Sequence, residues 1–169
     1  MNWFKDTKHL VYAAFSVALL AVSNYIFSFI PHVEVTTFLF IVLTFYLGKD
    51  MIMVAEVFAL IHIAQYGIHY WSIFYLYIWL IPVLITLLLK DKTKSMIVYA
   101  IVAGIFGCLY GTFTVLVTFP LGWRTTLAWW LSGLLWDVTH GICNFAVMLV
   151  LYKPINSALE IIFKEAELE

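Results

Sequence analysis

The chain has few charged side chains and few residues that interrupt helices. Charged residues make up only 11% of its 169 residues, and there are four prolines and eight glycines. Soluble domains carry about 25% charged residues, so this composition excludes an ordinary water-soluble fold. The formal net charge of −1 carries no information about a partner, because the individual charges are sorted by side rather than clustered. We expect no nucleic-acid partner.

The common signatures of nucleotide and metal chemistry are also absent. The sequence has no G-x-x-x-x-G-K-[ST] loop, no H-E-x-x-H and no C-x-x-C, and its histidines lack metal-ligand spacing. The two cysteines, Cys108 and Cys143, lie inside apolar segments and are interpreted as packing residues. We therefore expect no metal and no cofactor, and any ATP hydrolysis has to come from other subunits.

Long apolar segments dominate the chain. Hydrophobic residues make up 64% of it, and the mean hydropathy is +1.00. This predicts an all-α integral membrane protein with one domain, residues 1–169, built as a compact bundle of six transmembrane helices. The expected spans are about residues 9–30, 35–47, 51–66, 72–89, 95–119 and 125–152, the last closed by Lys153-Pro154, and an amphipathic tail over 155–166 lies at the membrane surface.

The second segment, residues 35–47, is short for a transmembrane helix. Thirteen residues cover about 20 Å, against about 30 Å for the hydrocarbon core. The segment is therefore in a thin membrane, partly sheltered by protein, or re-entrant together with the third segment. We prefer the six-span arrangement, and the re-entrant hairpin stays open.

Positive charge is sorted by side. The single arginine, Arg124, follows the fifth segment, whereas all eight lysines flank the opposite ends of the apolar segments, at Lys5, Lys8, Lys49, Lys90, Lys92, Lys94, Lys153 and Lys164. Because lysine and arginine concentrate in cytoplasmic loops, we expect both termini and the loops at 48–50 and 90–94 to be cytoplasmic. The loops near 31–34, 67–72 and 120–125 are then outside.

Polar side chains inside the apolar segments are candidates for function, because each costs about 2.5–3.5 kcal/mol at the bilayer centre unless it is partnered. Asp137, His140 and Asn144 follow one face of the sixth segment. Two interpretations of Asp137 and His140 stay open: contact with a ligand, or a buried pair that locks helix packing. Another polar face on the third segment contains His62, Gln65, Tyr66 and His69.

Aromatic and small residues add two further patterns. Indoles gather on the outer side, at Trp71, Trp123 and Trp130 among others, which indicates an interfacial belt or a pocket that stacks a planar organic ligand. Small residues recur at helical spacing, which allows close helix approach for internal packing or for a partner helix. They are Ala14 and Ala18 in the first segment and Ala100, Gly104, Gly107 and Gly111 in the fifth.

Three motifs occur together over nearly the whole chain: Ala14-x-x-x-Ala18, Ile30-Pro31-His32-Val33-Glu34, and a closing run in which Gly133, Asp137, His140-Gly141 and Asn144-Phe145 precede Leu151-Tyr152-Lys153-Pro154. Together they resemble the substrate-binding S components of energy-coupling factor (ECF) vitamin transporters. The closing run is similar to the G-x-x-x-D-x-x-H-G-x-x-N-F ending of many such proteins.

The resemblance implies a transport protein rather than an enzyme. It implies capture of a vitamin-like small molecule at the outer face of a prokaryotic plasma membrane and delivery by toppling within the lipid. Its implied partners are a transmembrane coupling subunit and two ATPase subunits, which form an ABC importer with it. Ala14 and Ala18 are the implied docking residues for the coupling subunit.

The implied substrate pocket lies in the outer half of the bundle. Cobalamin is slightly favoured as the substrate, and a smaller vitamin (a pyridoxine relative, pantothenate or a thiamine precursor) is the alternative. A small membrane enzyme using Glu56, Asp137 and His140 is a further alternative. The expected substrate-binding residues supply indoles for stacking, amides and imidazoles for hydrogen bonding, and Arg124 or Glu34 for charge pairing: Asn24, His32, Glu34, Gln65, His69, Trp71, Trp123, Arg124, Trp130, Asp137, His140 and Asn144.

Overall fold

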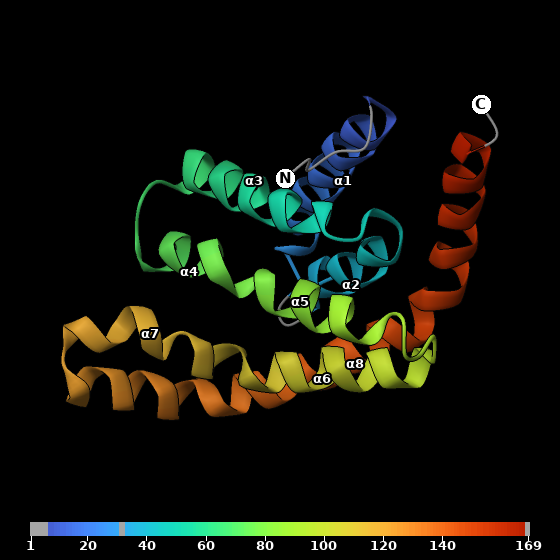
Figure 1. Cartoon of the computed structure of the whole chain (residues 1–169). Helices are drawn as coiled ribbons and strands as arrows, with labels where there is room; N and C mark the ends of the chain where they lie inside the picture. Colours follow the sequence, from blue (N-terminus) through green and yellow to red (C-terminus); the bar gives the residue numbers. More distant parts are fainter. Residues whose placement is uncertain (1–6, 31–32, 168–169) are drawn as a thin grey trace.

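The structure, a computed structural model, describes residues 7–30 and 33–167, with side chains as far as Phe163 (Figure 1). Within these residues the chain is helical and has no strands, which confirms the predicted all-α class. The elements are α1 (Thr7–Phe27), α2 (Thr36–Leu47), α3 (Asp50–Tyr66), α4 (Tyr70–Ile78), α5 (Leu80–Leu89), α6 (Met96–Phe113), α7 (Val115–Thr118), the 3-10 turn η1 (Phe119–Leu121) and α8 (Trp123–Glu167).

Four helical stretches of the described chain are long and apolar enough to cross a membrane. They are α1, the pair α4 and α5, the run from α6 to η1, and α8 from Trp123 to Phe163. Large apolar side chains such as Phe15, Leu116 and Leu135 are exposed along them. Because a soluble protein buries most such side chains, these stretches indicate a membrane protein.

Helix α2 is the buried centre of the bundle. Every residue from Thr36 to Thr44 is buried, and the helix packs against α1, α3, α5, α6 and α8. A helix that is apolar on all sides is stable only when other elements surround it. The other helices therefore shelter this short helix, which was one of the explanations open from its length.

Helices α6 and α8 form the most extensive contact in the bundle and run side by side (Figure 1). A Cβ added to Gly107 would lie 2.7 Å from the Cα of Gly141, and one added to Gly141 would collide with the Sγ of Cys108. The small residues of α6 thus allow close backbone approach to α8. For the small residues of α6, the structure therefore supports internal packing over contact with a partner helix.

Helix α8 does not end at Lys153-Pro154, as the sequence predicted, but continues through Pro154 to Glu167. Proline removes one backbone donor and usually bends a helix without always ending it, and the last part of α8 runs at a steep angle to the rest (Figure 1). The continuation is held by packing: the ring of Phe163 lies 4.7 Å from the rings of both Tyr12 and Tyr46. Tyr46 also donates a hydrogen bond to the Asn156 side chain at 2.9 Å.

The turns that carry lysines meet at one end of the bundle. A Cβ on Gly48 would lie 3.4 Å from the Nζ of Lys90, so the α2–α3 and α5–α6 turns are neighbours. His9, at the start of α1, pairs with Asp50 at 3.2 Å. Arg124 lies at the opposite end, where α8 begins after η1. We call the end of the bundle where the lysine-bearing turns meet the lysine end.

Candidate functional site

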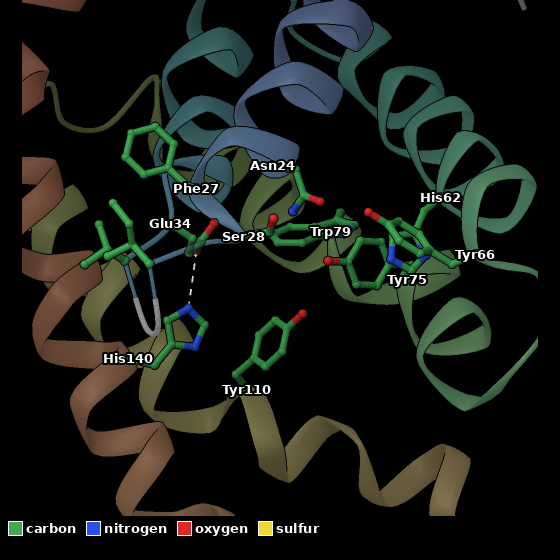
Figure 2. Close-up of a pocket in the computed structure, with 12 residues that line it drawn as sticks. Asn24, Phe27, Ser28, Glu34, His62, Tyr66, Tyr75, Trp79, Tyr110 and His140 are labelled. Atoms are coloured by element: carbon green, nitrogen blue, oxygen red, sulfur yellow. Dashed lines mark ion pairs between the residues drawn. The ribbon is translucent and has the colours of Figure 1, made fainter.

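Figure 2 shows a cavity of about 440 Å³. Its lining includes the ends of α1 and α3 that lie away from the lysine end. Its walls come from the last turns of α1 and α3, the α1–α2 connection, and the sections of α4, α6 and α8 that face them. Helices distant in sequence thus build one site. The lining residues are Asn24, Phe27, Ser28, Ile30, Val33, Glu34, His62, Tyr66, Tyr75, Trp79, Tyr110 and His140.

A carboxylate and an imidazole meet on one wall of this cavity. The Nε2 of His140 lies 3.4 Å from the Oε1 of Glu34 (Figure 2). Glu34 also accepts hydrogen bonds from the backbone N–H of Thr37 at 2.9 Å and from the Thr37 hydroxyl. Glu34 therefore caps the N-terminus of α2, where unpaired backbone N–H groups favour a negative charge.

The environment keeps Glu34 ionised. Burial alone would raise the pKa of its carboxyl, but hydrogen bonds and charge interaction with His140, together with the hydrogen bonds from Thr37, hold the pKa below its ordinary value. At neutral pH Glu34 is thus a carboxylate that faces the imidazole of His140 on the cavity wall.

Aromatic rings form the rest of the wall. The His62 ring stacks on Tyr75 with centroids 3.9 Å apart, and Trp79 stands edge-on to Tyr75 at 5.4 Å. Tyr110 lies between this group and His140, with its ring centroid 5.0 Å from the imidazole. The side chains of Asn24, Tyr75 and Tyr110 line the same cavity. Such a wall presents both π faces and polar edges to a ligand.

Two buried polar atoms of the lining have no hydrogen-bond partner in the described part of the chain. They are the Nε1 of Trp79, whose side chain is 2% exposed, and the Nδ1 of His62. Buried polar groups are nearly always satisfied in native proteins. Protein encloses both atoms, so a ligand could contact them only if the Trp79 or His62 ring turns toward the cavity.

Of the residues expected from the sequence, Asn24, Glu34 and His140 come together in this cavity. His32 lies outside the described residues. Trp71 and Asp137 line a neighbouring cavity of about 390 Å³, which shares Tyr110 and His140 with the first.

Three expected residues of α8 make contacts within the bundle. Asp137 accepts a hydrogen bond from the backbone N–H of Gly111 at 3.0 Å. Trp130 donates to the hydroxyl of Thr112 at 3.0 Å. Asn144 is buried and donates to Thr37 at 3.4 Å. These contacts hold α8 against α6 and α2.

The remaining expected residues are exposed and do not line the main cavity. Trp123 and Arg124 lie at the start of α8, and Gln65 lies at the end of α3. His69 precedes α4, with its Nε2 3.4 Å from the hydroxyl of Ser72. These residues lie at helix ends, outside the cavity wall.

The candidates from the sequence left out most of the aromatic wall. Tyr66, Tyr75, Trp79 and Tyr110 line the cavity, as does His62. Two of these pairs have a spacing of four residues, His62 with Tyr66 and Tyr75 with Trp79, which places each pair on one helix face. The sequence already places His62 and Tyr66 on one polar face by this spacing, although neither is among the expected substrate-binding residues. The same signal could have found Tyr75 with Trp79.

In the described residues no group of three or more His, Cys, Asp or Glu side chains is placed to hold a metal ion. Comparison with protein-family models, with curated proteins and with solved structures finds no match to the chain. Its function therefore has to be argued from the site.

Proposed function

We propose that the protein is the membrane-embedded substrate-binding subunit (S component) of an ECF-type ABC importer in a prokaryotic plasma membrane. The observation that carries the proposal is the aromatic cavity toward one end of an apolar helix bundle, opposite the lysine end. With lysines cytoplasmic, the cavity faces outside and both termini lie inside. This arrangement suits a protein that captures a solute from the exterior.

The central position of α2 supports the six-span arrangement within this proposal. A short helix surrounded by other helices does not need to match the full hydrocarbon thickness itself, because protein covers its backbone and side chains. Helices α2 and α3 then cross as the second and third spans, with Lys49 in the turn between them at the lysine end.

An exposed face of α1 supports the expected partner. Helix α1 buries Ala13, Val17 and Leu20, whereas Ala14 and Ala18 are exposed on its other side. Their small side chains are not used for packing within the chain, and they would let a helix of the coupling subunit approach closely. Two separate ATPase subunits hydrolyse ATP in this proposal, and the present chain catalyses no reaction.

The cavity volume favours a small vitamin over cobalamin. Small-molecule sites span roughly 300–1,000 Å³, and the 440 Å³ of this cavity lies near the lower limit. One or two fused or linked rings fit such a volume. A corrin is much larger and would have to rest over the mouth. A pyridoxine relative or a thiamine precursor is therefore the better substrate class within the proposal.

The experiment that tests the transport role uses Ala14→Leu and Ala18→Leu. Both substitutions should abolish co-purification with a tagged coupling module and abolish vitamin uptake, because a bulky side chain blocks close helix contact. Ligand binding by the purified protein should be unchanged, since neither residue lines the cavity.

Ala146→Leu is the matched control, because Ala146 is an exposed alanine on α8. It should leave assembly and uptake intact. Full uptake by the Ala14 and Ala18 variants would contradict the docking role, and wild-type protein that never associates with a coupling module would contradict the S-component proposal.

A further inference from the structure

We infer that the main cavity selects a flat heteroaromatic ligand that is neutral or positively charged, and that it rejects relatives bearing a carboxylate or phosphate. The inference rests on the proposed function, because it names the substrate class of the same site. It follows from the charge of the lining, from the arrangement of the rings and from the unpartnered polar atoms.

The charge of the lining is the first step. Glu34 is the only Asp, Glu, Lys or Arg among the described residues that line the cavity. Arg124 lies at the start of α8, and the lysines of the described chain lie at the lysine end. The imidazole of His140 also lines the cavity, but it is already paired with Glu34 at 3.4 Å. An anionic ligand would therefore have to compete with the Glu34 carboxylate for His140, and it would find no lysine or arginine in this partly desolvated lining to pair with instead.

The rings are the second step. Tyr75, Trp79 and Tyr110 present π faces and edges around one volume, with His62 stacked on Tyr75. Flat rings gain from offset or edge-on packing against such side chains. A positive charge on the ligand gains further from cation–π attraction and from the carboxylate of Glu34. A flexible aliphatic chain uses neither interaction well.

The unpartnered atoms are the third step. The Trp79 Nε1–H can only donate a hydrogen bond, and it has no acceptor among the described residues. Because protein encloses this nitrogen, a ring nitrogen or hydroxyl oxygen on the ligand would satisfy it only after the indole turns toward the cavity. The ligand class is thus a heteroaromatic ring with an acceptor on one edge and a donor or positive charge on the edge that faces Glu34.

The test uses the full chain purified in detergent and two matched pairs of probes: thiamine with thiamine monophosphate, and pyridoxine with pyridoxine 5′-phosphate. Pantothenate serves as an aliphatic carboxylate. Thermal unfolding and tryptophan fluorescence should report binding of thiamine, pyridoxine or both. The phosphate esters and pantothenate should bind at least about tenfold more weakly.

Two substitutions identify the groups involved. Glu34→Gln keeps the shape and an acceptor for Thr37 while removing the charge, so the affinity for a cationic ring should fall roughly ten- to hundredfold. Glu56→Gln is the control, because Glu56 lies on α3 away from the lining, and its affinity should match the wild type. Trp79→Phe keeps a ring but removes the donor, and it should weaken binding roughly three- to tenfold.

Equal or tighter binding of a phosphate ester or of pantothenate would overturn the inference, and so would the lack of binding by every neutral and cationic ring. Unchanged affinity for a cationic ring in a folded Glu34→Gln variant would also overturn it. The transport role fails in a different way: a protein that binds the ring but never associates with a coupling module would retain the ligand class and lose the S-component function.

Discussion

Asp137, His140 and Asn144 lie on one face of α8 but have different partners. Asp137 binds the backbone of Gly111, and Asn144 contacts Thr37. His140 pairs with Glu34 on the cavity wall. Asp137 thus holds α8 against α6 and lines the second cavity, whereas His140 lines both cavities. Contact of either residue with a ligand stays a prediction.

The close approach of α6 and α8 gives a prediction for Gly107. A methyl group there would lie 2.7–3.0 Å from backbone atoms of His140 and Gly141, which cannot move aside by changing a rotamer. We expect Gly107→Ala to lower the free energy of unfolding by about 1–3 kcal/mol, measured by thermal or denaturant unfolding in detergent.

Gly133→Ala is the control on α8, because a Cβ there would meet nothing within 4 Å. Alanine favours the helix by up to about 1 kcal/mol over glycine, so the control should be neutral or stabilising. Equal destabilisation by both substitutions would show that helix packing at Gly107 is not the cause.

The polar part of the site was easier to predict from the sequence than the aromatic part. His140 is costly inside an apolar segment, so its presence alone indicates a role, and Glu34 belongs to the Ile30-Pro31-His32-Val33-Glu34 motif that carries the resemblance. Tyr75 and Tyr110 are ordinary residues for a membrane protein, and many tyrosines of this chain pack elsewhere. Only the relative rotation of α4 and α6 determines which of them face the cavity.

At the scale of helices, the apolar segments and charged turns of the sequence predicted most helix bounds to within a few residues. The exceptions have physical causes. The fourth segment divides at Trp79 into α4 and α5, and the fifth ends in α7 and η1. The extension of α8 past Pro154 depends on contacts with Tyr12 and Tyr46, about 150 and 115 residues earlier in the chain. Sequence-local signals such as proline cannot reveal contacts of this range.

The extension of α8 gives the second prediction. Phe163 packs between Tyr12 and Tyr46, and its ring is half-buried. Phe163→Ala should therefore cost about 1–2 kcal/mol, less than the 3–5 kcal/mol of a fully buried phenylalanine. Hydrogen exchange of residues 155–163 should rise as the extension detaches from α1 and α2.

The adjacent Ile162 is exposed, so Ile162→Ala is expected to change stability by less than about 0.5 kcal/mol and to leave hydrogen exchange unaltered. If the Phe163 variant keeps the exchange protection of the wild type, the two ring contacts do not hold the extension.

At the scale of the whole molecule, charge and cavity occupy opposite ends. The Gly48–Lys90 and His9–Asp50 contacts bring the lysine-bearing turns together, whereas the cavity lies beyond α2, toward Arg124. In the proposed function, both the capture of an external solute and the docking of cytoplasmic ATPases depend on this separation. Chemical labelling can decide which of the two ends faces the outside of the cell.

The last prediction concerns that direction. In a chain with Cys108→Ser and Cys143→Ala, a single cysteine at Ile68 should react with a membrane-impermeant thiol reagent added to intact cells. Ile68 is 82% exposed between α3 and α4, on the cavity side. A single cysteine at Lys92, exposed between α5 and α6 at the lysine end, should react only after the membrane is opened. Positive charge on the cytoplasmic side requires this result, and the reverse pattern would place the cavity inside the cell, where it could not capture an external solute.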